Sequence, residues 1–110
     1  MQLVFLSLAV QDLASIRSYI AKNNPQAARQ VATRLKQSIY RLASMPNLGK
    51  PGRVFGIREL VTPLIGKTAY VVVYRVKENR LEILRILPGM RDIDSILRDT
   101  PLEEDSTTLT

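Results

Sequence analysis

The fold is decided by the stretch AYVVVYRVKENRLEILRIL, which spans residues 69–87. Two runs of β-branched, leucine and aromatic residues flank a polar break at residues 77–80, and this pattern predicts two antiparallel strands joined by a turn. Residues 71–73 are consecutive valines, which are apolar on both faces of a strand. The first of the two strands should therefore lie in the middle of a sheet that is covered on both faces.

Two further strands are expected N-terminal to this hairpin. Residues 57–62 form another β-branched run, separated from the hairpin by the connection at residues 63–67, so three strands should form an antiparallel meander. Residues 2–6 (QLVFL) are too few for a helix and predict an N-terminal strand. We expect this strand to pair beside the central one, residues 69–76.

Two amphipathic helices are predicted between the first strand and the meander. In the first, which Ser7 can cap, apolar residues recur at spacings of three or four: Val10, Leu13, Ile16 and Ile20. Asn24 and Pro25 suit the N-cap and first position of a second helix. Its apolar stripe is Ala28, Val31, Leu35, Ile39 and Leu42. The two helices should form a hairpin, and residues 45–52 (MPNLGKPG) a turn-rich connection.

The C-terminal part should close the domain with a short helix. Pro88 and Gly89 end the last strand, and Ile93, Ile96 and Leu97 predict one or two helical turns before Pro101. The predicted fold class is therefore α+β: an N-terminal strand, a two-helix hairpin, a three-stranded antiparallel meander and a short C-terminal helix. Residues 1–98 should form a single domain, and residues 99–110 an acidic, flexible tail.

Composition limits the chemistry and favours acidic partners. The chain has 110 residues, no histidine and no cysteine, so disulfides, thiol nucleophiles and zinc sites are not expected, and neither is any cofactor. Residues 1–98 carry all 16 bases but only six of the ten acids, a net charge of +10 that attracts anionic partners. Without a long apolar run or a signal-like N-terminus, the expected location is the cytoplasm, away from membranes.

Arginines on or beside the predicted strands are the notable chemical groups: Arg53, Arg58, Arg75, Arg85 and Arg91. Strand alternation places Arg75 with Val71 and Val73, and Arg85 with Ile83 and Leu87, which is unusual for a solvated charge. They could simply pair with Glu59, Glu82 or Asp92. Six acids cannot neutralise sixteen bases, however, so several arginines should face solvent or a partner.

Several segments resemble, in order, the pattern of ParE-type toxins of the RelE/ParE superfamily. They are residues 12–21 (DLASIRSYIA), 24–28 (NPQAA), 49–54 (GKPGRV), 56–61 (GIRELV), 70–76 (YVVVYRV) and 83–87 (ILRIL). The resemblance covers nearly all of residues 1–95. It implies the toxin of a type II toxin-antitoxin system, held inactive by a ParD-like antitoxin whose C-terminal segment wraps the helix hairpin and the sheet.

The superfamily contains two activities, and the residues here bear on the choice. RelE-like members cleave mRNA on the ribosome, and Arg58 and Arg91 match two of their basic positions. Val71, however, stands where RelE carries a strand arginine, and residues 88–90 read Pro-Gly-Met where His-Gly-Arg is frequent. These departures favour the ParE-like activity, non-enzymatic inhibition of DNA gyrase. Because ParE-like members often carry histidine where Pro88 stands, a detoxified module that only binds its antitoxin is a third alternative.

We expect four arginines to make the partner contacts: Arg58, Arg75, Arg85 and Arg91. The resemblance places Arg85 and Arg91 nearest the strand end that ParE-like toxins use. The expected partners are the ParD-like antitoxin and DNA gyrase, with DNA met only indirectly, through gyrase or through the antitoxin complex.

Overall fold

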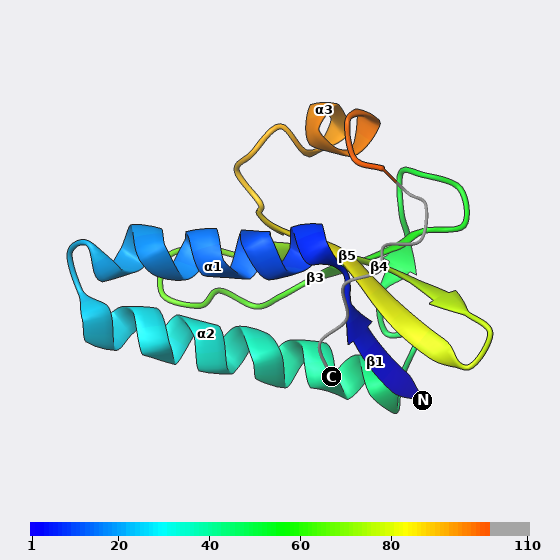
Figure 1. The fold of residues 1–110 in the computed structure, drawn as a ribbon, viewed down its shortest axis with the longest axis horizontal. Coiled ribbons are helices and arrows are strands. Elements are labelled where there is room, and N and C mark those ends of the chain that lie inside the picture. Colours follow the sequence, from blue (N-terminus) through cyan, green and yellow to red (C-terminus); the bar gives the residue numbers. More distant parts are fainter. Residues whose placement is uncertain (102–110) are drawn as a thin grey trace.

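The protein is a mixed five-stranded sheet with a long helix hairpin on one face and a short helix on the other (Figure 1). The computed structural model describes residues 1–101, so most of the predicted acidic tail lies outside the described residues. In chain order the elements are β1 Gln2–Phe5, α1 Ser7–Ala21, α2 Pro25–Tyr40, the 3-10 turn η1 Arg41–Ala43, β2 Lys50–Pro51, β3 Arg58–Val61, β4 Tyr70–Lys77, β5 Arg80–Pro88 and α3 Ile93–Arg98. The α+β class and the order of elements agree with the prediction.

The strand order is β1-β5-β4-β3-β2. Strands β3, β4 and β5 form the predicted antiparallel meander, with β4 in the middle. The prediction that β1 pairs beside β4 was wrong: β1 runs parallel to β5, from Gln2 opposite Arg80 to Phe5 opposite Ile83. The reason is that hairpin partners already occupy both edges of β4, so β1 can only join the open edge of β5. The two-residue strand β2, which pairs with the start of β3, was not predicted.

The helix hairpin covers one face of the sheet and builds the larger core. The predicted stripe of α2 and η1 is buried, and all of it except Ala28 belongs to this core. Helix α1 contributes the buried Ala9 and Ile16 and the half-buried Val10, Leu13 and Ile20. Asn24 caps α2 as predicted, because its side chain accepts a hydrogen bond from the amide of Ala27 (3.0 Å). Ser7, in contrast, is the first residue of α1 and not its cap; Leu6 takes the cap position without a side-chain hydrogen bond.

The second face of the sheet is covered by α3 and the segment before β3. Val71 and Val73 of β4 pack in a second apolar cluster together with Ile93 and Leu97 of α3. The consecutive valines at residues 71–73 of β4 are all buried, so the central strand is covered on both faces, as its sequence predicts. No helix of residues 1–101 is long and apolar enough to cross a membrane.

A β-bulge lies between β4 and β5 and changes which side chains share a face. Val73 lies opposite Arg85 whereas Tyr74 lies opposite Ile83, so Leu84 is an extra residue in β5. As a result Ile83 packs under the helix hairpin and Leu87 under α3. The expectation that Arg85 shares one parity with both residues was therefore wrong.

Candidate functional site

Arg75 lies in an ion-paired cluster on the sheet. Its Nε donates to Glu82 Oε1 (2.7 Å), while Arg80 Nη2 donates to the other oxygen of the same carboxylate (2.6 Å). Glu82 is fully buried, which would raise its pKa, but the hydrogen bonds from Arg80 and Arg75 outweigh this and hold the pKa below its usual range. Arg75 therefore stabilises a buried carboxylate within the fold.

Arg85 joins three elements of the fold. Its Nε and Nη2 donate to the two carboxylate oxygens of Asp12 on α1 (2.7 and 2.8 Å), and Nη1 donates to the hydroxyl of Thr100 just after α3 (2.8 Å). Asp12 also accepts from the amide of Ile86 (2.9 Å), at the edge of β5 beyond the end of β1. The bond to Asp12 raises the pKa of Arg85. This arginine is a structural link.

Arg53 neutralises Glu59. Its backbone amide and its Nε donate to one carboxylate oxygen of Glu59 (both 2.9 Å) and its Nη2 to the other (3.0 Å), while Nη1 reaches Asp94 on α3 (3.0 Å). Burial would raise the pKa of Glu59, but the bonds from Arg53 lower it below its usual range. Glu59 thus pairs with the arginine of the preceding loop and not with Arg58, its neighbour on β3.

Arg58 differs from these three because its side chain bonds only to neutral groups. Its Nε donates to the carbonyl of Gly49 (3.0 Å), and its Nη2 donates to the carbonyls of Gly49 and Asn47. Among the described residues no carboxylate pairs with it, and Nη1 makes no hydrogen bond. The guanidinium is therefore held in place with its charge uncompensated.

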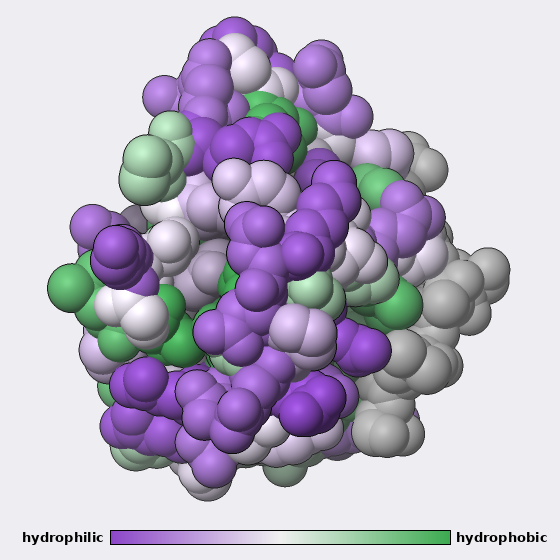
Figure 2. All heavy atoms as spheres, turned by 90° about the vertical axis from the view of Figure 1, so that its left-hand side faces the viewer, coloured by the Kyte–Doolittle hydropathy of each residue, from purple (hydrophilic) through white to green (hydrophobic). Residues whose placement is uncertain are grey.

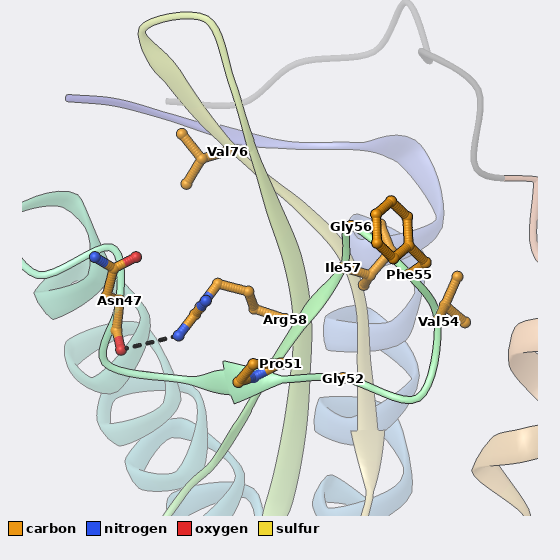
Figure 3. Close-up of a pocket in the computed structure, with 9 residues that line it drawn as sticks. All are labelled: Asn47, Pro51, Gly52, Val54, Phe55, Gly56, Ile57, Arg58 and Val76. Carbon is orange, nitrogen blue, oxygen red and sulfur yellow. Dashed lines mark hydrogen bonds between the residues drawn. The ribbon is translucent and has the colours of Figure 1, made fainter.

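Arg58 lies in an open hollow of about 420 Å³ at the margin of the sheet (Figure 3). We call this the Arg58 hollow; its lining residues are Asn47, Pro51, Gly52, Val54, Phe55, Gly56, Ile57, Arg58 and Val76. Phe55 is completely exposed and Val76 is 42% exposed. Arg58 is the one charged residue of the lining, so the hollow combines a single cation with apolar walls.

Arg91 lies in the connection between β5 and α3, where its side chain is exposed and has no hydrogen bond or ion pair to any residue from 1 to 101. Asp92 beside it is engaged elsewhere, because its carboxylate accepts from the amide (3.3 Å) and hydroxyl (2.8 Å) of Ser95 as the cap of α3. The expected pairing of an arginine with Asp92 is thus absent from this part of the chain. Met90, which directly precedes Arg91, is 90% exposed.

The surface at the turn end of the helix hairpin is mainly hydrophilic. Viewed from that end, hydrophobic residues appear as small separated spots between hydrophilic ones (Figure 2). Such a surface offers polar and charged contacts to a partner and no broad apolar patch.

The structure does not bring the four predicted contact arginines into one cluster. Arg75 and Arg85 hold buried or half-buried carboxylates, whereas Arg58 and Arg91 keep uncompensated charges. These two are also apart: Arg58 lies opposite Tyr74 of β4, and Arg91 follows Pro88, which lies opposite Tyr70 at the start of β4. The candidate site therefore consists of two separate positions, one at the start of β3 and one in the connection after β5.

Two site residues were missed by the sequence reasoning. Phe55 follows the turn-rich segment, and its exposure cannot be read from a pattern that is neither helical nor alternating. The second is Tyr74, which is fully buried in β4. Its hydroxyl also donates to the carbonyl of Pro46 (2.7 Å) and accepts from the amide of Gly49 (2.9 Å), so it fixes the loop whose carbonyls hold Arg58.

The arginines of the site can bind anionic groups, but the chain offers few groups for proton transfer. The chain has no histidine or cysteine, and burial raises the pKa of Tyr70 further above neutral pH. No group of three or more metal-ligating side chains occurs within residues 1–101. Arginine forks at Arg58 and Arg91 suit carboxylates or phosphates of a partner.

Comparison with known proteins gives consistent matches. The family described as the ParE toxin of the type II toxin-antitoxin system parDE matches residues 3–93. A protein of Sinorhizobium fredii named as a toxin, Y4kP, is 35% identical over 81% of this chain and 88% of its own length. Toxin RelE2 of Caulobacter vibrioides is 36% identical over 82% of this chain and 97% of its own length.

A solved structure has the same fold. It is a chain of a chromosomal ParDE toxin-antitoxin system from P. aeruginosa, with a TM-score of 0.68 and 25% sequence identity. The match covers 80% of this chain and 95% of that one. The shared region includes most of the domain described above.

Proposed function

Because this chain belongs to the ParE toxin family of type II toxin-antitoxin systems, we propose that it inhibits DNA gyrase and is neutralised by a cognate antitoxin. Both encounters would take place in the cytoplasm. Inhibition here is a binding function: the toxin holds gyrase on its DNA and itself breaks no bond.

The observation that carries the proposal is the uncompensated arginine at the end of the sheet. Arg91 stands on an exposed turn next to exposed Met90, and the turn is fixed by hydrogen bonds from Arg91 N to Pro88 O (3.0 Å) and from Gly89 N to Ala69 O (2.9 Å). An exposed arginine beside an apolar side chain on a fixed backbone is typical of residues that dominate protein interfaces. The lack of histidine in the chain also supports binding over acid-base chemistry.

The test is a gyrase supercoiling reaction with the purified chain. We expect inhibition or accumulation of cleaved DNA, and Arg91→Ala should weaken either effect about tenfold, the loss of one good interface contact. Arg17→Ala is the matched control, since it removes the same charge from an exposed site on α1. Full activity of the Arg91→Ala chain would overturn the role of Arg91, and no effect of the wild-type chain would overturn gyrase as the target.

A ribosome-dependent mRNA endonuclease is the second candidate function. It is favoured by the similarity to Toxin RelE2 and by the uncompensated charge of Arg58, which could bind an RNA phosphate. Cut mRNA in a translation extract, without inhibition of gyrase, would establish this alternative.

The third candidate is a detoxified module that only binds its antitoxin. Pro88 favours it, because it takes the position at which ParE-like toxins often carry histidine. Induced expression without the antitoxin separates this candidate from the other two, since growth would then continue unaffected.

A further inference from the structure

The Arg58 hollow carries a charge that nothing in the described part of the chain neutralises. Three donor contacts, from Nε and Nη2, go to the carbonyls of Gly49 and Asn47, which orient the guanidinium but leave its charge in place. Nη1 keeps its hydrogen-bonding capacity. A carboxylate would neutralise this arginine and accept its free hydrogen bond, as Asp12 does for Arg85.

The walls of the hollow are apolar and unusually exposed. Phe55 and Val76 lie on different sides of the Arg58 side chain in Figure 3; Phe55 is completely exposed and Val76 is 42% exposed. Aromatic and arginine side chains that meet in one hollow are the usual anchors of peptide and protein interfaces. The lining therefore suits a ligand that carries an apolar side chain next to its carboxylate.

The hollow is also preorganised. Gly52 N donates to Ile57 O (2.8 Å), and Arg53 ties the same loop to the buried carboxylate of Glu59. The loop that carries Phe55 is thus fixed at both ends before any partner arrives. Binding would order the partner more than the protein, which favours a flexible segment as the occupant.

We propose that the Arg58 hollow binds a peptide segment of the antitoxin in which one carboxylate is flanked by large apolar side chains. The carboxylate would pair with Arg58 Nη1, and the apolar side chains would pack on Phe55 and Val76. The attribution to the antitoxin rests on the proposed function, whereas the chemistry of the segment rests on the hollow alone. A single-stranded nucleic acid fits less well, because its affinity comes from several phosphate contacts and the lining offers one cation.

The first experiment follows the full chain by NMR while peptides are added. The probes are the acetylated, amidated tetrapeptide Leu-Glu-Leu-Leu, its Leu-Gln-Leu-Leu counterpart and an eight-residue oligothymidylate. We expect the Glu peptide to shift the Arg58 Nε–H signal and the amides of residues 55–58, and the Gln peptide to bind about tenfold more weakly. No shift with millimolar Glu peptide, or equal binding of the two peptides, would overturn the proposal.

The second experiment uses two matched substitutions. Val76→Glu places a carboxylate at the hollow and should abolish peptide binding by occupying Arg58. Val61→Glu makes the same change on β3 outside the hollow, at a residue of similar exposure (52% against 42%), and should leave binding unchanged. Equal effects of both substitutions would overturn the assignment, as would tighter binding of the oligothymidylate at these residues.

The outcome is independent of the gyrase assay. Peptide binding at Arg58 without gyrase inhibition would reject the proposed target and keep the hollow. Gyrase inhibition without peptide binding would reject the hollow and keep the target.

Discussion

The carboxylate of Asp12 accepts three hydrogen bonds from β5: two from the guanidinium of Arg85 and one from the backbone amide of Ile86. Its side chain is 13% exposed and that of Arg85 is 16% exposed, so little water competes for these bonds. Removing either partner leaves the other without its counter-charge at a mostly buried site, which is more costly than losing a surface ion pair.

We therefore predict that Asp12→Ala and Arg85→Ala each lower the free energy of unfolding by about 3 kcal/mol. The double variant should lose at least about 1 kcal/mol less than the sum, because the second substitution removes a group that the first has already left unpaired. Urea unfolding of the four proteins measures this coupling. Arg91→Ala, exposed and unpaired, is the control and should change stability by less than about 0.5 kcal/mol.

The same variants decide whether Arg85 is a contact residue. If Arg85→Ala unfolds like the wild type but fails to inhibit gyrase, Arg85 is a partner contact, as expected from the sequence. The structure favours the opposite result, in which activity falls only as far as folding does.

The sequence could identify arginines as the important residue type but could not sort them. Composition shows that six acids cannot neutralise sixteen bases, and this remains correct. Which base finds an acid depends on residues far apart in the chain: Asp12 reaches Arg85 across 73 positions, and Asp94 reaches Arg53 across 41. Such pairs follow from helix placement over the sheet, which no local pattern records.

At the scale of elements, the loop of residues 44–49 and strand β2 act as a strap along the outer edge of β3. Lys50 and Pro51 pair with Glu59 and Arg58, and Tyr74 holds the loop from the central strand. A Cβ added at Gly49 would lie 2.7 Å from the Tyr74 hydroxyl and 2.8 Å from the Glu59 carbonyl, so this close approach requires glycine. The strap supplies the carbonyls that hold Arg58.

We predict that Tyr74→Phe destabilises the protein by about 1–3 kcal/mol, because the buried amide of Gly49 loses its acceptor. The melting temperature should fall by roughly 5 °C or more for a domain of this size. Tyr40→Phe is the matched control, since Tyr40 is 53% exposed and no hydrogen bond of its hydroxyl occurs within the described residues.

A second measurement locates the effect. Hydrogen exchange of the Gly49 amide should speed up in Tyr74→Phe, while the amides in the middle of β4 and β5 change less. Identical melting temperatures of the two Tyr→Phe variants would show that the hydroxyl of Tyr74 does not hold the strap.

Element types were largely predictable here, and pairing partners were less so. The helices, the meander and the short last helix each have a local period or a local run of β-branched residues, which sequence reveals directly. The placement of β1 beside β5 depends on which strand edge remains open after the meander forms. The bulge at Leu84 and the two-residue β2, which contains a proline, have no periodic signal either.

At the scale of the whole molecule, charge is unevenly divided along the chain. Residues 1–98 carry a net charge of +10, and the remaining acids are Asp99, Glu103, Glu104 and Asp105. Packing continues slightly beyond the predicted domain end: Asp99 caps α3, and Thr100 is buried and bonded to Arg85. A deletion that tests the acidic segment should therefore begin after Pro101, so that the link between Arg85 and Thr100 stays intact.

We predict that removing residues 102–110 raises the affinity for an anionic partner, because three negative charges no longer weaken the field of the basic domain. The measurement is binding to a short DNA duplex at about 50 mM and about 300 mM salt, where the Debye length falls from above 10 Å to well below it. The affinity gain should be several-fold at low salt and should largely vanish at high salt, since screening removes long-range repulsion first. A full-length chain with Glu103→Gln, Glu104→Gln and Asp105→Asn keeps the length and should bind like the deletion. If the deletion alone gains affinity, the segment acts through its bulk and not its charge, and if neither does, the acids leave the basic domain's field unchanged.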